Sequence, residues 1–119
     1  MSKISEVIHT FSMAVDQRQV KAADGVLHAD FRALVNQFMG SDGVTVLPKS
    51  AYLDMLKQEK IGGDQRQVKV HSINLTNNVA VARVTFTGKE LVFHTFIQLV
   101  EDKKGNWLII SDMPNVEVK

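Results

Sequence analysis

Asp112 and His71 are the two titratable side chains that could carry chemistry in an apolar pocket. If they lie in β-strands with regular alternation, both point to the same side of the sheet as Thr95. A carboxyl group buried among apolar side chains has a raised pKa and can serve as a general acid or base. Tyr52 could add a phenolic hydrogen-bond donor. Asp112 and His71 are therefore the candidate catalytic residues. The structural alternatives are an Asp112 that caps a turn and a His71 that is satisfied by a neighbour at the rim.

The elements that must position these residues are strands. Residues 66–112 have the pattern of three long β-strands joined by short turns, with Asn77-Asn78 and Gly88-Lys89 as turn residues and residues 102–105 as a longer loop. Alternation predicts one nearly pure hydrocarbon face, which must be the core side. Its residues are Ile73, Leu75, Ala80, Ala82, Val84, Phe86, Leu91, Phe93, Ile97, Leu99, Leu108 and Ile110.

The N-terminal half is largely helical by pattern. A first helix carries an apolar stripe with helical spacing, formed by Ile4, Val7, Ile8, Phe11, Ala14 and Val15. A second helix is predicted over residues 19–27, strands over 31–38 and 44–47, and a third helix from Ser50. A long sheet needs an amphipathic partner to bury its apolar face. The expected fold is α+β, with the helices packed in a strongly curved, mixed or antiparallel sheet and a pocket between the two layers.

The opposite face of the predicted sheet is too apolar to be simply solvated and too polar to be core. It carries Arg83, His94, Phe96 and Gln98, together with Trp107 and Ile109. Aromatic residues and arginine among apolar neighbours are typical of a subunit interface. The sequence therefore predicts a homodimer built through the outer sheet face. A β-bulge in any strand would exchange the two faces beyond it.

Composition limits the remaining function classes. The 119 residues, 45% of them hydrophobic, are enough for one domain over residues 1–119 with its own core. A net charge of +1 with scattered Lys and Arg argues against nucleic acid as a partner. The absence of cysteine excludes disulfides and thiolate chemistry. Neither a signal-peptide pattern nor a membrane span is present, so a cytoplasmic location is expected. The four histidines lack the spacing of metal ligands, and no cofactor is expected.

Three segments carry a family resemblance that covers essentially the whole chain. They are residues 26–31 (VLHADF), residues 42–53 (DGVTVLPKSAYL) and residues 105–110 (GNWLII). Their order and spacing resemble the nuclear transport factor 2-like superfamily of cone-shaped α+β folds, in the branch named for lumazine binding and related to the SnoaL-like polyketide cyclases. The resemblance implies a pocket at the open end of the cone and a dimer. It implies no reaction. Where members of the branch often have Asp and Lys, this chain has Thr95 and Asp112.

Three functions remain open at this point. The first is a dimeric protein that binds a small hydrophobic ligand in a pocket lined by Phe11, Tyr52, Phe93, Thr95 and Ile97, with His71 and Asp112 as further polar groups. The second is an isomerase, cyclase or dehydratase with Asp112 or His71 as general base, following the logic of ketosteroid isomerase, a standard example of this chemistry. The third is a non-catalytic interaction module that works through the outer sheet face.

Overall fold

The computed structural model describes residues 2–119. Within them the chain forms three α-helices: α1 (Lys3–Asp16), α2 (Val20–Val26) and α3 (Lys49–Lys57), with a short 3-10 helix η1 (Phe38–Gly40). The strands are β1 (Leu27–Asn36), β2 (Val44–Pro48), β3 (Gln67–Thr76), β4 (Val79–Thr87), β5 (Leu91–Glu101) and β6 (Trp107–Val118). The predicted helices and turns are present, and the C-terminal region contains four strands rather than three.

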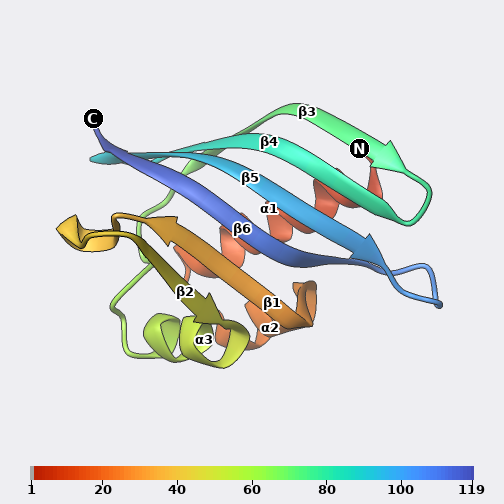
Figure 1. Cartoon of the computed structure of the whole chain (residues 1–119), viewed down its shortest axis with the longest axis horizontal. Coiled ribbons are helices and arrows are strands. Elements are labelled where there is room, and N and C mark those ends of the chain that lie inside the picture. Colours follow the sequence, from red (N-terminus) through yellow and green to blue (C-terminus); the bar gives the residue numbers. More distant parts are fainter. Residues whose placement is uncertain (1) are drawn as a thin grey trace.

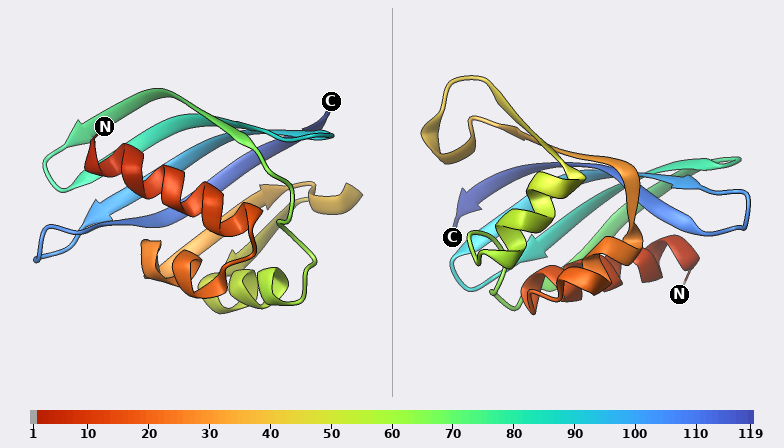
Figure 2. Two further views of the ribbon diagram at one scale, coloured as in Figure 1. Left: turned by 180° about the vertical axis from the view of Figure 1, so that it is seen from behind. Right: turned by 90° about the horizontal axis from the view of Figure 1, so that it is seen from below.

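One six-stranded sheet forms the frame of the molecule. Its order is β2-β1-β6-β5-β4-β3, with β1 parallel to β6 and every other pair antiparallel. The sheet arches over the helices, and α1, α2 and α3 all lie on its concave side (Figures 1 and 2). The predicted α+β fold with helices packed in a curved mixed sheet is confirmed.

Helix α1 is the main element that covers the inner face of the sheet. Ser2 begins it as an N-cap, because its hydroxyl accepts a hydrogen bond from the Ser5 amide at 3.1 Å. The helix buries the row Ile4, Ile8, Phe11, Ser12, Ala14 and Val15. The predicted stripe is therefore the buried face, apart from Val7, which is only partly buried.

The inner sheet face meets this helix with the residues that alternation predicted. Ala80, Ala82, Val84, Phe86, Ile97 and Leu99 are all buried. Two of the predicted core residues lie near strand ends instead, where Leu75 is 58% exposed and Leu91 is 37% exposed. The prediction is thus correct for the centre of the inner face and wrong for its ends.

A β-bulge in β6 reverses the predicted sides of residues 107–110. Gln98 pairs with Ser111 while Leu99 pairs with Ile109, so Ile110 is the extra residue. Ile109 is consequently fully buried and Trp107 is 9% exposed, although both were expected on the outer face. The expectation that Leu108 and Ile110 face the core is wrong for the same reason. Beyond the bulge the alternation returns to the predicted phase.

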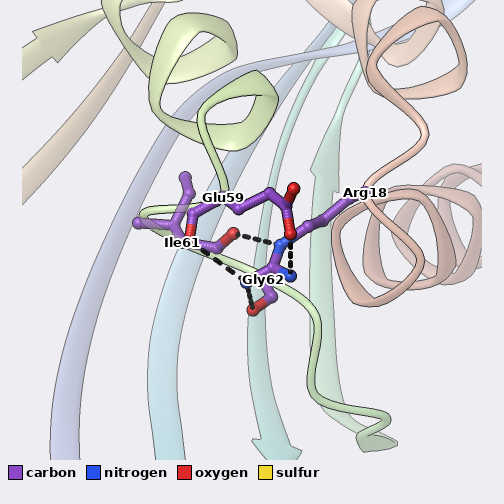
Figure 3. Close-up of polar contacts among 4 residues, drawn as sticks. All are labelled: Arg18, Glu59, Ile61 and Gly62. Atoms are coloured by element: carbon purple, nitrogen blue, oxygen red, sulfur yellow. Dashed lines mark hydrogen bonds and ion pairs between the residues drawn. The ribbon is translucent and has the colours of Figure 1, made fainter.

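Arg18 fixes the loop that leads from α3 into β3 (Figure 3). Its Nε donates to the Ile61 carbonyl at 3.1 Å, and Nη2 donates to the Gly62 carbonyl at 3.0 Å and the Glu59 carbonyl at 3.3 Å. The Gly62 backbone has φ +78°, and a Cβ there would lie 2.4 Å from the Val15 carbonyl oxygen. Only glycine fits such a position. The clamp holds the start of β3, and with it Arg66, against the end of α1.

Candidate functional site

Asp112 and Thr95 form a buried polar pair on the inner face of the sheet. Asp112 on β6 lies opposite Ile97 on β5 and beside Ala33 on β1. Thr95 is two residues before Ile97, so its side chain shares the same face. The Thr95 hydroxyl donates a hydrogen bond to Asp112 Oδ1. Asp112 is 7% exposed and Thr95 is 2% exposed. The sequence prediction that these two side chains point to the concave side is correct.

Burial sets the acid–base properties of this pair. It raises the pKa of Asp112 to about 6, against the opposing effects of the Thr95 hydrogen bond and the positive charge of Arg66. Burial and, to a lesser extent, the Asp112 charge also raise the pKa of the Tyr52 hydroxyl. Asp112 can therefore exchange a proton close to neutral pH, while Tyr52 stays protonated and can act only as a neutral hydrogen-bonding group.

Four aromatic rings pack against one another in the same core, and one of them, Tyr52, feels the charge of Asp112. The ring centroids of Phe11 and Tyr52 are 6.2 Å apart, those of Phe31 and Tyr52 are 5.4 Å apart, and those of Phe11 and Phe86 are 6.5 Å apart. The five predicted pocket residues do converge in the core: Phe11, Tyr52, Thr95 and Ile97 are buried, and Phe93 is partly buried against them. Their side chains pack together in this structure.

A buried ion pair that the sequence did not predict lies next to these aromatic rings. Arg66 Nε lies 2.6 Å from Asp16 Oδ1, and both side chains are 8% exposed. The guanidinium carbon of Arg66 lies 4.6 Å from the ring centroid of Phe86 and 5.0 Å from that of Phe93. A signal was present in the sequence, because Arg66 continues the inward-facing alternation of Val68 and Val70. Asp16 likewise continues the Ile8–Ser12 row of α1.

His71 lies on the outer face, so its predicted position in the pocket is wrong. Val70 pairs with Val84 and Ser72 with Arg83, which makes His71 the extra residue of a bulge. Its Nε2 lies 2.7 Å from Thr85 Oγ1, which lies 3.3 Å from His94 Nδ1. Slight burial and the nearby positive charge of Arg83 lower the pKa of His71. His71 is therefore separated from Asp112 by the sheet.

Two surface hollows lie outside the aromatic core. The larger, about 600 Å³, lies between the start of α1, the end of α2 and the β5–β6 loop, and its lining includes Lys3, Val7, Thr10, Val26, Asn106 and Trp107. The smaller, about 270 Å³, is lined by His9, Ser12, Met13, Asp16, Gln17, Gln65, Arg66 and Val68. Neither hollow is lined by Asp112, Thr95 or Tyr52, and the three side chains are themselves buried.

Residues 2–119 contain no group of three or more His, Asp or Glu side chains arranged to hold a metal ion. No helix within residues 2–119 combines the length and the apolar character needed to cross a membrane.

The fold is similar to solved structures of low sequence identity. An NTF-2-like protein of unknown function from Silicibacter pomeroyi DSS-3 is 14% identical with a TM-score of 0.82, covering 96% of this chain and 92% of that one. One from Shewanella baltica OS155 is 14% identical with a TM-score of 0.83, covering 97% and 91%. A ketosteroid isomerase-like protein from Erwinia carotovora atroseptica SCRI1043 is 10% identical with a TM-score of 0.76, covering 95% and 92%.

Sequence comparison identifies the family. No curated protein matches the chain. The family model described as "Putative lumazine-binding" matches residues 1–113. The structural neighbours agree with this match, since they share the cone of helices and curved sheet over almost the whole chain. The chain therefore belongs to the putative lumazine-binding family, and its fold is that of the NTF2-like structures.

Proposed function

We propose that this protein binds a small, mainly apolar molecule inside the cone, with Asp112 and Thr95 as its polar recognition groups. The observation that carries the proposal is a carboxyl group with a pKa raised to about 6 among aromatic rings. Burying such a group is unfavourable unless hydrogen bonds compensate for lost hydration. A ligand that donates a hydrogen bond to Asp112 would supply that compensation.

The packing sets a condition on binding. The rings of Phe11 and Tyr52 stack inside the cone, and Arg66 covers Phe86 and Phe93. A ligand must therefore displace at least one of these side chains. A flat heteroaromatic molecule suits this exchange, because it can replace an aromatic ring in the stack while its N–H groups reach the carboxyl.

Lumazine is the first probe, since it is flat, uncharged and carries ring N–H donors. Calorimetric titration of the protein with lumazine should give saturable binding, and Asp112→Asn should weaken it about tenfold through loss of a charge-assisted hydrogen bond. Thr85→Val on the outer face is the matched control and should bind like the parent. Equal affinity of the Asp112→Asn variant would remove Asp112 from the site. If lumazine does not bind, a thermal-shift screen of apolar heterocycles with the same two variants repeats the test.

The pKa of Asp112 also favours a second candidate, proton transfer as in an isomerase, cyclase or dehydratase. A general base works best when its pKa lies near the operating pH. In D₂O, the protein should catalyse deuterium incorporation next to the carbonyl of a β,γ-unsaturated ketone, followed by proton NMR. Asp112→Asn should abolish the exchange without unfolding the protein, and His71→Ala should leave it unchanged. Undiminished exchange in the Asp112→Asn variant would exclude this role.

We further propose that two copies associate through the outer sheet face. Val46, Leu34, Met113, Phe96 and Arg83 follow one another across β2, β1, β6, β5 and β4, with Val46 51%, Phe96 49% and Met113 47% exposed. The helices all cover the other side, so no element of residues 2–119 covers this apolar row (Figure 2). His94 and Gln98, the other predicted interface residues, lie on the same strand as Phe96 and on the same face.

Sedimentation equilibrium tests the association. The parent protein should sediment as a dimer, and Phe96→Asp should convert it to a folded monomer because a buried unpaired charge is costly. Met13→Asp is the control, since Met13 is 48% exposed on α1, away from the sheet face. A dimer that persists in the Phe96→Asp variant would place the interface elsewhere.

A further inference from the structure

Arg66 lies between the smaller hollow and the aromatic core. Its side chain lines the hollow beside α1. The guanidinium carbon lies 4.6 Å from the ring centroid of Phe86 and 5.0 Å from that of Phe93. Phe86 packs in turn against Phe11, with ring centroids 6.5 Å apart. One side of Arg66 therefore borders a hollow at the surface, and the other side covers rings of the proposed cone site.

The charge of Arg66 also reaches the polar groups of the cone. It opposes the rise in the pKa of Asp112 and the rise in the pKa of Tyr52, both of which burial causes. Charge effects weaken with distance and with intervening water. Arg66 is therefore close to the proposed recognition groups, although neither Asp112 nor Tyr52 lines the smaller hollow.

One hydrogen bond from a protein side chain holds the guanidinium group over the rings. Arg66 Nε donates to Asp16 Oδ1 at 2.6 Å, whereas Nη2 has no partner among residues 2–119. The other oxygen of Asp16 accepts the backbone N–H of residue 66 at 3.0 Å, so the two side chains do not form a bidentate pair. A donor that is unpaired when buried gains hydrogen bonds when it moves into water. The Asp16 contact thus holds Arg66 in place, while the unpaired donor lowers the cost of releasing it.

The smaller hollow provides room for the released side chain. Its volume is about 270 Å³, several times the roughly 30 Å³ that one water occupies in the liquid. We propose that Arg66 is the gate of the cone, and that its guanidinium group moves into this hollow, uncovers Phe86 and Phe93, and admits the apolar ligand between α1 and β3. The ligand class rests on the proposed function, whereas the movement of Arg66 does not depend on it.

A thiol placed inside the cone measures the opening without any ligand. The chain has no cysteine, so Thr95→Cys introduces a single thiol beside Asp112. Its rate of reaction with iodoacetamide is followed by mass spectrometry at mildly alkaline pH. Adding Asp16→Asn removes the charge-assisted hydrogen bond to Arg66 and should raise this rate at least about tenfold.

A second substitution tests the gate on the arginine itself. Arg66→Lys, in the same Thr95→Cys protein, keeps a positive charge for Asp16 but lacks the planar group that covers both rings. It should also raise the rate of thiol reaction. Unchanged rates in both the Asp16→Asn and Arg66→Lys variants would overturn the gate.

Ile109→Ala is the matched control for simple loss of stability. It leaves a cavity in the core on β6 and does not alter the contacts of Arg66. Thiol reaction that requires global unfolding accelerates steeply with urea, whereas reaction after a side-chain movement exposes little surface and is nearly independent of low urea. At equal free energy of unfolding, the Asp16→Asn variant should therefore react faster than the Ile109→Ala variant. Equal rates under that condition would also overturn the gate.

The outcome separates the gate from the cone site. Fast, urea-independent thiol reaction without lumazine binding would support the movement of Arg66 and remove lumazine as the ligand. Lumazine binding without a faster reaction in the Asp16→Asn variant would support the cone site and overturn Arg66 as its entrance.

Discussion

The two faces of the sheet use similar polar side chains in different surroundings. On the inner face, Thr95 donates to a buried carboxyl whose pKa burial raises to about 6. On the outer face, Thr85 lies between the exposed rings of His71 and His94. Both threonines hydrogen-bond a titratable side chain, but only the inner one lies where water cannot compete. Burial therefore raises the pKa of Asp112 against the opposing Thr95 hydrogen bond, whereas slight burial and nearby positive charge lower the pKa of His71.

The largest difference in stability between the two faces should appear when their arginines are substituted. Arg66→Met removes the charged partner of the buried Asp16, which keeps only the backbone N–H of residue 66, and should lower the free energy of unfolding by about 3–5 kcal/mol. Arg83→Met, on the outer face, should change it by less than about 0.5 kcal/mol when it is compared in the Phe96→Asp background, where the proposed interface is broken. Urea denaturation of both variants measures this. Adding Asp16→Asn to the Arg66→Met variant should recover much of the loss, and equal effects of the two single variants would contradict the contrast.

The β6 bulge makes neighbouring isoleucines unequal. Ile109 is fully buried, whereas Ile110 is only partly buried. Ile109→Ala should reduce stability by about 2–5 kcal/mol through cavity formation. Ile110→Ala should cost less than about 1.5 kcal/mol, because less buried surface is removed. Regular alternation predicts the reverse order, so urea denaturation of these two variants decides whether the bulge is present.

Sequence alone was sufficient where side-chain periodicity is regular. The stripe of α1, the alternation of β4 and β5 and the turn at Asn77-Asn78 gave the fold, its inner face and the positions of Asp112 and Thr95. Periodicity failed at His71 and Ile110, because each is one extra residue in a strand. A bulge is decided by the partner strand, so it leaves little trace in the local pattern.

The Asp16–Arg66 pair shows a second limit of prediction from the sequence. These residues are 50 positions apart, and their pairing depends on the loop that Arg18 holds in place. Each residue had a local signal for facing inward, but neither signal identifies its partner. The unpartnered donors of Ser12 and Arg66 are also properties of three-dimensional packing. The candidate pocket residues could thus be named from sequence, while the charges and hollows around them could not.

Asp112 should leave a signature in the pH dependence of stability. Its folded pKa of about 6 lies above the ordinary aspartate value of 3.8, so the folded state holds the proton more tightly. Stability should therefore fall as pH rises from about 4 to 6, by up to about 3 kcal/mol. Asp112→Asn removes this contribution, so the variant should gain stability relative to the parent over that range.

Urea denaturation of both proteins at pH 4 and pH 7 measures the difference. Asp102→Asn provides a control of opposite sign, because backbone hydrogen bonds from Asn106 and Lys104 lower the pKa of Asp102. The parent should therefore gain stability relative to the Asp102→Asn variant as pH rises from about 2 to 4, so this control is measured over that range. A pH-independent difference between the parent and the Asp112→Asn variant would mean that Asp112 titrates normally.

The two threonines give the smallest and most local contrast. Thr95→Val removes the hydroxyl that stabilises the ionised form of Asp112, so the pKa of Asp112 should rise above about 6. The substitution should also cost about 1–3 kcal/mol at pH 7, where a buried acceptor loses its donor. Thr85→Val should leave both quantities unchanged, because Thr85 lies across the sheet from Asp112. Carbon-13 NMR titration of the Asp112 carboxyl carbon measures the pKa directly. An unchanged value in the Thr95→Val variant would show that burial alone, without this hydrogen bond, determines the proton affinity of the site.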